Sequence, residues 1–169
     1  MSNANQPGQQ HESLLHTGEV IPAFTLPGAD GMPYSPWNYK QREHLVLLFL
    51  RSTTTSETRG LLRTFAQHYS SFREETCAIL AITPDTVFDN LHAQEALHLP
   101  FALLADPKGE VISRYTQWDN SARALTPSIV LADRYGALYQ QWLAKNEANL
   151  PPISELLDSL QYLNKLCTP

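Results

Sequence analysis

The stretch LVLLFLRSTTTSETRGLLRTF, from Leu45 to Phe65, decides the fold of this chain. It opens with an uninterrupted apolar run, Leu45–Leu50, which predicts a buried strand. A polar segment, 51–56, follows that run. Beyond the polar segment, apolar residues recur at helical spacing, namely Leu61, Leu62, Phe65, Tyr69 and Phe72. We therefore expect a strand, a polar loop and a helix over about 57–72, and loops that follow strands in open α/β sheets are where sites are found.

The polar loop contains a signal for the start of the helix. Thr54 is followed three residues later by Glu57, which is the spacing of a capping box. In that motif the threonine hydroxyl accepts a hydrogen bond from a backbone N–H near the acidic residue. We predict that Thr54 caps the helix and that the helix starts at about Ser56.

The rest of the chain alternates predicted strands and helices. The predicted elements are a hairpin or extended arm over 18–39, a strand over 77–82, a helix over 85–97, a short strand over 101–104, a short helix over 110–115, a loop over 117–125, strands over 128–132 and 137–143 on either side of a tight turn, and an amphipathic helix after Pro151 and Pro152. The apolar strands show little alternation with polar residues, so we expect a sheet that is covered on both faces.

Length and composition predict a single domain. A chain of 169 residues can bury one sizeable core, so we expect a domain over 17–166 after a disordered tail over 1–16. The net charge of −5 argues against binding to nucleic acid or to an anionic membrane, and the longest apolar run is too short to span a bilayer. The N-terminus lacks the basic and apolar regions of a secretory signal, and the chain has only two cysteines, which favours a cytoplasmic location.

Four segments of the chain carry a family resemblance. They are GEVIPAFTLPGADG (18–31), AILAITPD (78–85), LPFALLADPKGEVISRY (99–115) and TPSIVLADRYG (126–136). In this order and spacing they resemble the alkyl hydroperoxide reductase C / thiol-specific antioxidant (redoxin) family, over about 18–163. The resemblance implies a peroxiredoxin-like thioredoxin fold, which is a three-layer α/β/α arrangement with a central mixed sheet, here with an N-terminal hairpin extension. It also implies an ancestry among antioxidant thiol oxidoreductases that need no cofactor.

The active-site motif of this family is altered in the polar loop. Relatives have an R-G-x-W-C-P-x-C-R or a P-x-x-x-T-x-x-C pattern, and on these patterns Arg51, Thr55, Thr58 and Arg59 occupy the motif positions. Both cysteine positions are therefore threonine. A threonine hydroxyl stays protonated without a strong base, and the loop offers no such base. We assign no catalytic residue, and we expect the standard thiol peroxidase reaction to be absent.

The same loop remains a candidate binding site. Helix-start N–H groups, the hydroxyls of Thr54, Thr55 and Thr58, and the guanidinium groups of Arg51 and Arg59 together suit a small polar or anionic ligand. The alternative is that the threonines only cap the helix and that the arginines are solvated or form ordinary ion pairs.

A second candidate segment is Thr126–Pro127. The resemblance aligns it with the cis-proline that faces the active-site loop in thioredoxin-like proteins, so we predict a cis bond; the alternative is a trans proline at a strand start. If this geometry persists, a cysteine introduced at Thr58 should have a depressed pKa, whereas a trans bond counts against a ligand site. Relatives bind partners at this loop, so we expect either a protein partner or a small polar or anionic ligand here. A homodimer is also possible.

The two cysteines support the competing hypotheses. Cys77 begins an apolar strand and is expected to be buried, and Cys167 lies beyond the last predicted helix. An alternative function is that of a weak thiol oxidoreductase or peroxidase that uses Cys77 or Cys167, and another is that of a structural partner of an active paralogue. The cysteine and histidine spacings do not match a metal site, so we predict none.

Overall fold

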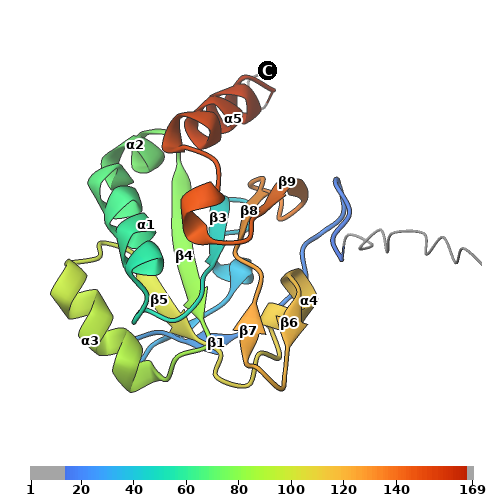
Figure 1. Cartoon of the computed structure of the whole chain (residues 1–169). Helices are drawn as coiled ribbons and strands as arrows, with labels where there is room; N and C mark the ends of the chain where they lie inside the picture. Colours follow the sequence, from blue (N-terminus) through green and yellow to red (C-terminus); the bar gives the residue numbers. More distant parts are fainter. Residues whose placement is uncertain (1–13, 167–169) are drawn as a thin grey trace, which may run out of the picture.

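The fold is built on a five-stranded mixed sheet. We describe it from a computed structural model, which describes residues 14–166 (Figure 1). The strands of the sheet, in spatial order, are β5 (Ala102–Ala105), β4 (Cys77–Thr83), β3 (His44–Phe49), β8 (Ser128–Ala132) and β9 (Leu138–Leu143). β3, β4 and β5 run parallel, and β8 and β9 complete the sheet in antiparallel fashion. The strands predicted over 77–82, 101–104, 128–132 and 137–143 are all present.

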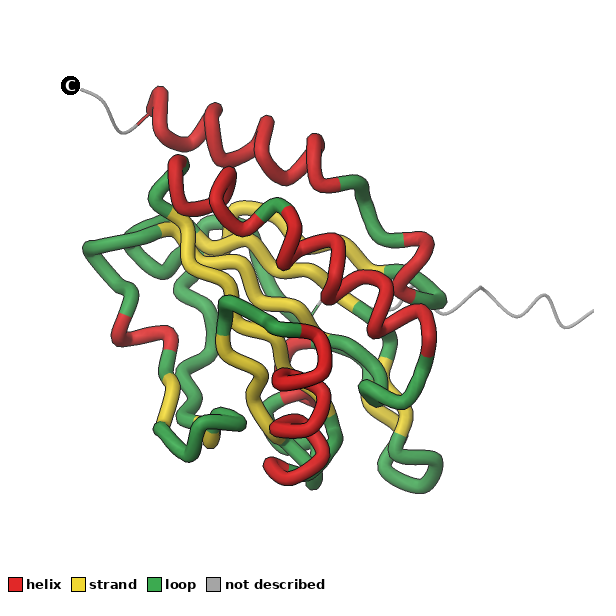
Figure 2. Tube along the Cα trace, turned by 90° about the vertical axis from the view of Figure 1, so that its left-hand side faces the viewer, coloured by secondary structure: helices red, strands yellow, loops and turns green. Residues whose placement is uncertain are grey.

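The two faces of the sheet are covered differently (Figure 2). The longer helices pack on one face; they are α1 (Ser56–Gln67), α2 (Tyr69–Glu74), α3 (Val87–Leu97) and α5 (Ile153–Leu166). The other face is covered by the N-terminal segment and by the short helix α4 (Ile112–Tyr115). The predicted helix over 57–72 is divided into α1 and α2, because His68 departs from helical geometry with φ −104° and ψ 10°.

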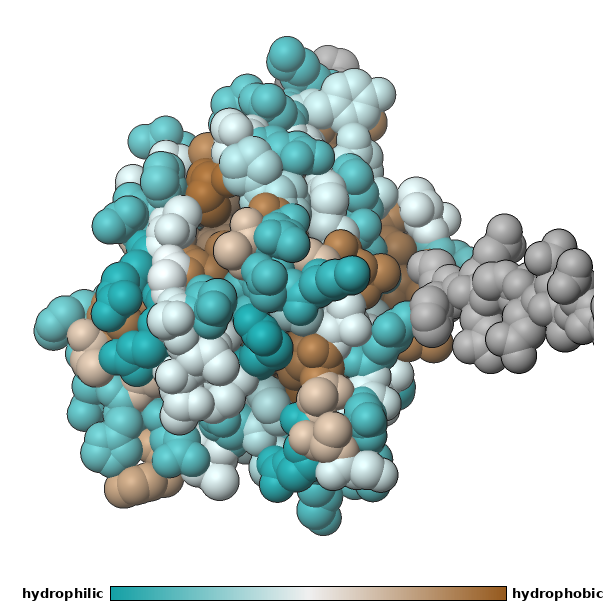
Figure 3. Space-filling model, viewed as in Figure 1, coloured by the Kyte–Doolittle hydropathy of each residue, from teal (hydrophilic) through white to brown (hydrophobic). Residues whose placement is uncertain are grey.

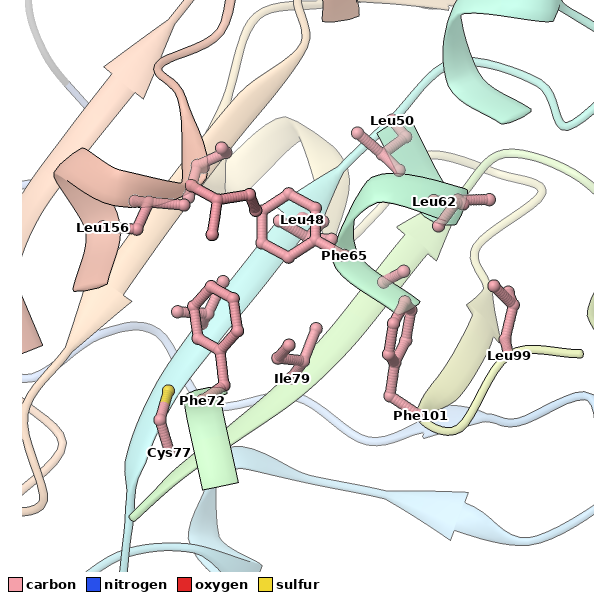
Figure 4. Packing of buried hydrophobic residues seen from close by; sticks show 14 of the residues in the cluster. Leu48, Leu50, Leu62, Phe65, Phe72, Cys77, Ile79, Leu99, Phe101 and Leu156 are labelled. Atoms are coloured by element: carbon pink, nitrogen blue, oxygen red, sulfur yellow. The ribbon is translucent and has the colours of Figure 1, made fainter. Parts of the chain in front are cut away.

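Burial on both faces explains the unbroken apolar run of β3. Val46, Leu48 and Leu50 belong to the cluster under the longer helices, where Leu48 lies beneath Phe65 of α1 (Figure 4). Leu47 and its alternate neighbours in β3 belong to the cluster on the opposite face. Each fully buried aliphatic side chain of this size stabilises the fold by about 1.5–3 kcal/mol relative to an exposed one. The central strand therefore anchors both layers and fixes the position of the loop that follows it.

Short elements complete the described part of the chain. They are the hairpin β1 (Leu26–Pro27) and β2 (Pro33–Tyr34), the hairpin β6 (Trp118–Asp119) and β7 (Ala124–Leu125), and the 3-10 turns η1 (Pro36–Asn38) and η2 (Glu147–Asn149). The second hairpin lies where we expected a loop. Most of the predicted tail over 1–16 falls outside the described residues, and Leu15, which is described, is buried.

The architecture is the thioredoxin fold, as predicted. A βαβ unit formed by β3, α1, α2 and β4 is followed by α3 and β5, and the β8–β9 hairpin and α5 close the sheet. Within residues 14–166, no helix combines the length and the apolar character that crossing a bilayer requires.

Candidate functional site

Three segments that are distant in sequence meet at one edge of the sheet. β3 ends at Phe49 directly opposite Ser128, where β8 begins, so the residues after Phe49 lie beside Pro127. The carbonyl of Pro127 in turn accepts a hydrogen bond from the backbone N–H of Ala144 at 3.0 Å. The polar loop 51–56, the segment Thr126–Pro127 and the chain that leads into η2 therefore share this edge.

The first turn of α1 is capped by Thr55 and not by Thr54. The Thr55 hydroxyl oxygen accepts from the backbone N–H of Thr58 at 3.3 Å, whereas the Thr54 hydroxyl pairs with the Ser52 hydroxyl at 2.9 Å. The prediction for Thr54 is therefore wrong. The helix does begin at Ser56, so the residue before it is Thr55, and the capping distance of three residues leads to Thr58 instead of Glu57.

Thr58, which the sequence resemblance aligns with the second cysteine of the motif, is fully buried. Its hydroxyl accepts a hydrogen bond from the Thr55 hydroxyl at 2.7 Å and donates one to Oε1 of Glu147 at 2.9 Å. The two hydroxyls thus form a short chain that ends on a carboxylate. This leaves Thr58 oriented inward, with its hydroxyl occupied by Glu147.

Glu147 is the centre of the site, and it comes from η2. The residue is only 1% exposed, and both oxygens of its carboxylate accept hydrogen bonds. The backbone N–H of Arg51 donates to Oε1 at 2.9 Å, and the Arg51 side chain donates through Nε and Nη2 to Oε2 at 2.9 and 2.5 Å. Burial alone would raise the pKa of Glu147, but the hydrogen bonds from Arg51 and Thr58 outweigh it and hold the pKa below its usual value. Glu147 is therefore an anion that is matched by the cation of Arg51.

Sequence reasoning missed Glu147. It lies 96 positions from Arg51, in a segment without a motif, and only the tertiary fold brings the two together. It supplies the acceptor that the polar loop lacks, but it is a weak base because its pKa is lowered. A weak base beside a fully buried hydroxyl does not form a nucleophile.

Arg59 and Thr53 brace the outer side of the loop. Nη1 of Arg59 donates to the Thr53 carbonyl at 3.3 Å. The backbone N–H and the hydroxyl of Thr53 both donate to Oδ2 of Asp85 at 2.8 Å. Asp85 precedes α3, so these bonds tie the loop to the neighbouring strand end. Of the two predicted arginines, Arg51 points to the Glu147 carboxylate and Arg59 holds the loop backbone.

The Thr126–Pro127 bond is trans, since residues 14–166 contain no cis peptide bond. The predicted cis bond is therefore wrong, and the alternative of a trans proline at a strand start holds. The trans form is intrinsically favoured for an X–Pro bond, and the chain here extends the β6–β7 ladder in that form. The backbone N–H of Thr126 donates to the Gln117 carbonyl at 3.0 Å, and the Thr126 carbonyl accepts from the Thr116 hydroxyl at 2.7 Å.

A cavity of about 630 Å³ lies beside Thr126. Its walls include Trp118 and Leu125 of the β6–β7 hairpin and Leu14 at the start of the described chain. The surroundings of such a cavity are mixed in character, because the space-filling view shows hydrophilic side chains over most of one face of the molecule, with separate hydrophobic patches between them (Figure 3). The cavity borders the Thr126–Pro127 segment and is apolar in part, which distinguishes it from the filled polar cluster around Glu147.

The described cysteine lies far from this edge. Cys77 is fully buried at the first residue of β4, the opposite end of the strand from the site, and burial raises the pKa of its thiol. The prediction of a buried Cys77 is confirmed. Cys167 lies outside the described residues. Within residues 14–166, no cluster of three His, Cys, Asp or Glu side chains is placed to hold a metal ion.

Comparison with known proteins gives a consistent set of relatives. A model of the AhpC/TSA family matches residues 17–147. A Mycobacterium tuberculosis protein proposed to be a peroxiredoxin is 31% identical over 101 residues, which are 60% of this chain and 64% of that protein. Peroxiredoxin Bcp of Bacillus subtilis is 24% identical over 134 residues, which are 76% of this chain and 85% of that protein. The chain thus spans slightly under two thirds of the Mycobacterium relative and most of the Bacillus one.

Solved structures show the same fold at low sequence identity. The crystal structure of peroxidoxin BcpB from Mycobacterium tuberculosis superposes with a TM-score of 0.79 at 18% identity, covering 88% of this chain and 97% of that one. The reduced 2-Cys peroxiredoxin of Plasmodium vivax gives a TM-score of 0.79 at 16% identity, covering 88% and 96%. Identities this low establish the fold, while the family model covers the greater part of the chain.

Proposed function

The chain belongs to the AhpC/TSA family, and on that premise we propose that it is a member without thiol peroxidase activity that serves as a binding domain for a protein partner. The observation that carries the proposal is the hydrogen bond from Thr58 to Glu147. A threonine stands at the motif position of the attacking cysteine, and its hydroxyl is held by a carboxylate of the same chain. A peroxide that reached this position would meet a threonine hydroxyl bound to a carboxylate, and it would find no thiolate nucleophile.

A protein partner is better supported than a small anion. While Glu147 is in place, it matches the guanidinium of Arg51 through Nε to Oε1 at 3.1 Å and Nη2 to Oε2 at 2.5 Å. Arg51 therefore offers little charge to a free anion in this state. The trans bond before Pro127 also departs from the geometry on which the small-ligand expectation rested. We therefore set that ligand aside and keep the partner.

Exposed apolar surface near the site supports the partner. Phe88, at the start of α3, is 67% exposed, and its ring contacts His92 edge-on. It lies three residues after Asp85, the carboxylate that holds Thr53 in the loop. Large exposed aromatic side chains are typical of contact sites between proteins. A cytoplasmic location is part of this proposal, and the low cysteine content supports it.

The enzymatic half of the proposal is tested by peroxide consumption with dithiothreitol or thioredoxin as the reductant. We expect no turnover above the background, with the Bacillus subtilis relative as the positive control. Turnover at the rate of that control, abolished by Cys77→Ser or by Cys167→Ser, would overturn the proposal and support a thiol peroxidase that uses that cysteine instead.

The partner half is tested by photo-crosslinking in cells. A photoreactive phenylalanine analogue is placed at Phe88 or, as a matched control, at Tyr135, which is 58% exposed in the turn between β8 and β9 at the opposite end of the sheet. We expect a discrete crosslinked species from position 88 and none from position 135. Absence of any crosslink from position 88, or the same species from both positions, contradicts a partner at this edge.

A further inference from the structure

The donors around Glu147 form a socket with the shape of one carboxylate group. Three N–H groups of Arg51 and the hydroxyl of Thr58 converge on the two oxygens of Glu147, at distances of 2.5 to 2.9 Å. Nε also lies 3.1 Å from Oε1, so two N–H groups of the guanidinium face both carboxylate oxygens, which is a strong arrangement in proteins. All four donors come from the β3 end and from α1, and the acceptor alone comes from elsewhere in the chain. The socket is therefore complete without Glu147.

The segment that brings the acceptor is largely self-contained. Asn146 caps η2 by accepting from the backbone N–H of Ala148 at 2.9 Å, and the backbone N–H of Leu150 donates to the Glu147 carbonyl at 3.2 Å. Ala144 and Leu150 fix the two ends of the segment, through the bond to the Pro127 carbonyl and through burial. The side chain of Glu147 is thus the polar link between the middle of this segment and α1.

Space remains beside this link. A cavity of about 390 Å³ separates part of α1 from the segment around η2. Gly60 and Leu61 of α1 line one side, and Ala148 and Pro151 line the other. Glu147 itself borders this cavity, whereas Arg51 and Thr58 do not. A group that enters through the cavity therefore reaches the donors only where the Glu147 side chain now lies.

We propose that Arg51 and Thr58 form a binding site for a single carboxylate group, and that Glu147 is its autoinhibitory occupant. The external ligand is the Asp or Glu side chain of a protein partner, so this inference rests on the proposed function and names the chemistry of the partner. Only one carboxylate fits at a time, because the donors are the same. Glu147 belongs to the same chain, so its carboxylate has a high effective concentration at the donors. An external carboxylate binds when Glu147 is removed or when it binds the donors more tightly than Glu147 does.

The test is chemical rescue, with formate and acetate as probes. In Glu147→Ala the socket keeps its donors and loses its occupant. We expect sodium formate and sodium acetate to raise the melting temperature of this variant by several degrees in a saturable way, relative to sodium chloride at equal ionic strength. Wild-type protein should not respond, because its socket is filled.

Two matched variants exclude other causes of stabilisation. Glu147→Gln fills the same space without a charge and should show no rescue. Glu43→Ala removes the carboxylate of a surface ion pair with Arg73 and should show none either. Equal responses of all variants, or no response of Glu147→Ala, would overturn the proposal. If Glu147→Ala does not fold in chloride, the refolding yield in formate against chloride gives the same decision.

The outcome is independent of the peroxide assay. If the rescue fails, the proposed lack of thiol peroxidase activity is unaffected, because the peroxide assay uses the wild-type protein and its cysteines. Peroxide turnover would in turn overturn the proposed function without affecting the rescue. A short acetylated and amidated peptide that carries one Glu, compared with the same peptide carrying Gln, then tests a side-chain carboxylate directly. Binding of the Glu peptide to Glu147→Ala, with none of the Gln peptide, supports the stated partner chemistry, and equal binding of both contradicts it.

Discussion

The carboxylate of Glu147 lies 2.9 Å from the hydroxyl of Thr58, although the two residues are 89 positions apart in the chain. A helix start normally attracts an anion because its first N–H groups lack partners within the helix. Here the chain supplies both parts of the arrangement, with Thr58 in the first turn of α1 and Glu147 in η2. The start of α1 is therefore tied to η2 by an internal ion pair and its hydrogen bonds.

Removal of the carboxylate should destabilise the protein strongly. Glu147→Ala leaves the Arg51 guanidinium without its anion, and breaking a buried pair on one side costs about 3–5 kcal/mol. Because the Arg51 side chain remains 33% exposed, we expect about 3 kcal/mol, at the lower end of that range. Urea denaturation of Glu147→Ala, Arg51→Ala and the double variant measures the coupling. Additive effects of the two substitutions would show that the pair contributes no interaction of its own.

The capping residue can be identified by two adjacent alanine substitutions. Thr55→Ala removes the side-chain acceptor for the Thr58 N–H and should cost about 1 kcal/mol. Thr54→Ala removes only a contact with the Ser52 hydroxyl on the exposed side of the loop, so we expect a change within about 0.5 kcal/mol. The free energies of unfolding of the two variants, compared side by side, are the measurement. A larger loss in Thr54→Ala would reverse the assignment.

A cysteine introduced at Thr58 should be a poor nucleophile. It would lie against the Glu147 carboxylate, and a nearby negative charge raises the pKa of a thiol above its usual value of about 8.5. This modifies the expectation of a depressed pKa, which considered only the helix start. Iodoacetamide reactivity against pH is the measurement. The double change Thr58→Cys with Glu147→Gln should titrate at a lower pH than Thr58→Cys alone, and identical profiles would contradict an effect of the carboxylate.

His44 should make stability depend on pH. Its side chain is fully buried at the start of β3, with Nε2 bound to Asn164 of α5 at 2.8 Å, and burial lowers its pKa. The unfolded chain then binds more protons than the folded one once the pH falls below about 6.5. Stability is therefore present above that pH and declines as the pH falls towards the lowered folded value.

The measurement for His44 is the melting temperature between pH 7.5 and 5.5. The wild type should lose stability over this range, and His44→Gln should lose less of it. His92→Gln is the control, because the ring of His92 lies on the exposed side of α3. If His44→Gln keeps the full slope, another group is responsible for the pH dependence.

The fold could be predicted from sequence because its signals are local. The apolar run of β3 and the stripe of α1 each indicate their structure within a few residues, and turns separate the strands. The division of helix 57–72 at His68 was not predicted, because the apolar stripe continues through the break to Tyr69 and Phe72 and hides it.

The site could be predicted only in part, because its decisive contacts are not local. The position of the loop between β3 and α1 was predicted correctly, but three consecutive threonines, Thr53 to Thr55, make the capping residue ambiguous by one position. The isomer of the Thr126–Pro127 bond is selected by the surrounding structure, and the Arg51–Glu147 pair depends on the whole fold. Neither leaves a pattern in the sequence.

The bond between Thr58 and Glu147 also bears on how such a protein can evolve. A single substitution that introduces a thiol at position 58 produces a cysteine facing an anion, which raises the pKa of that thiol. The other order, in which Glu147 is lost first, leads through a protein with an uncompensated Arg51 and reduced stability. Both single-step routes to a reactive thiol at position 58 are therefore disfavoured by the internal ion pair.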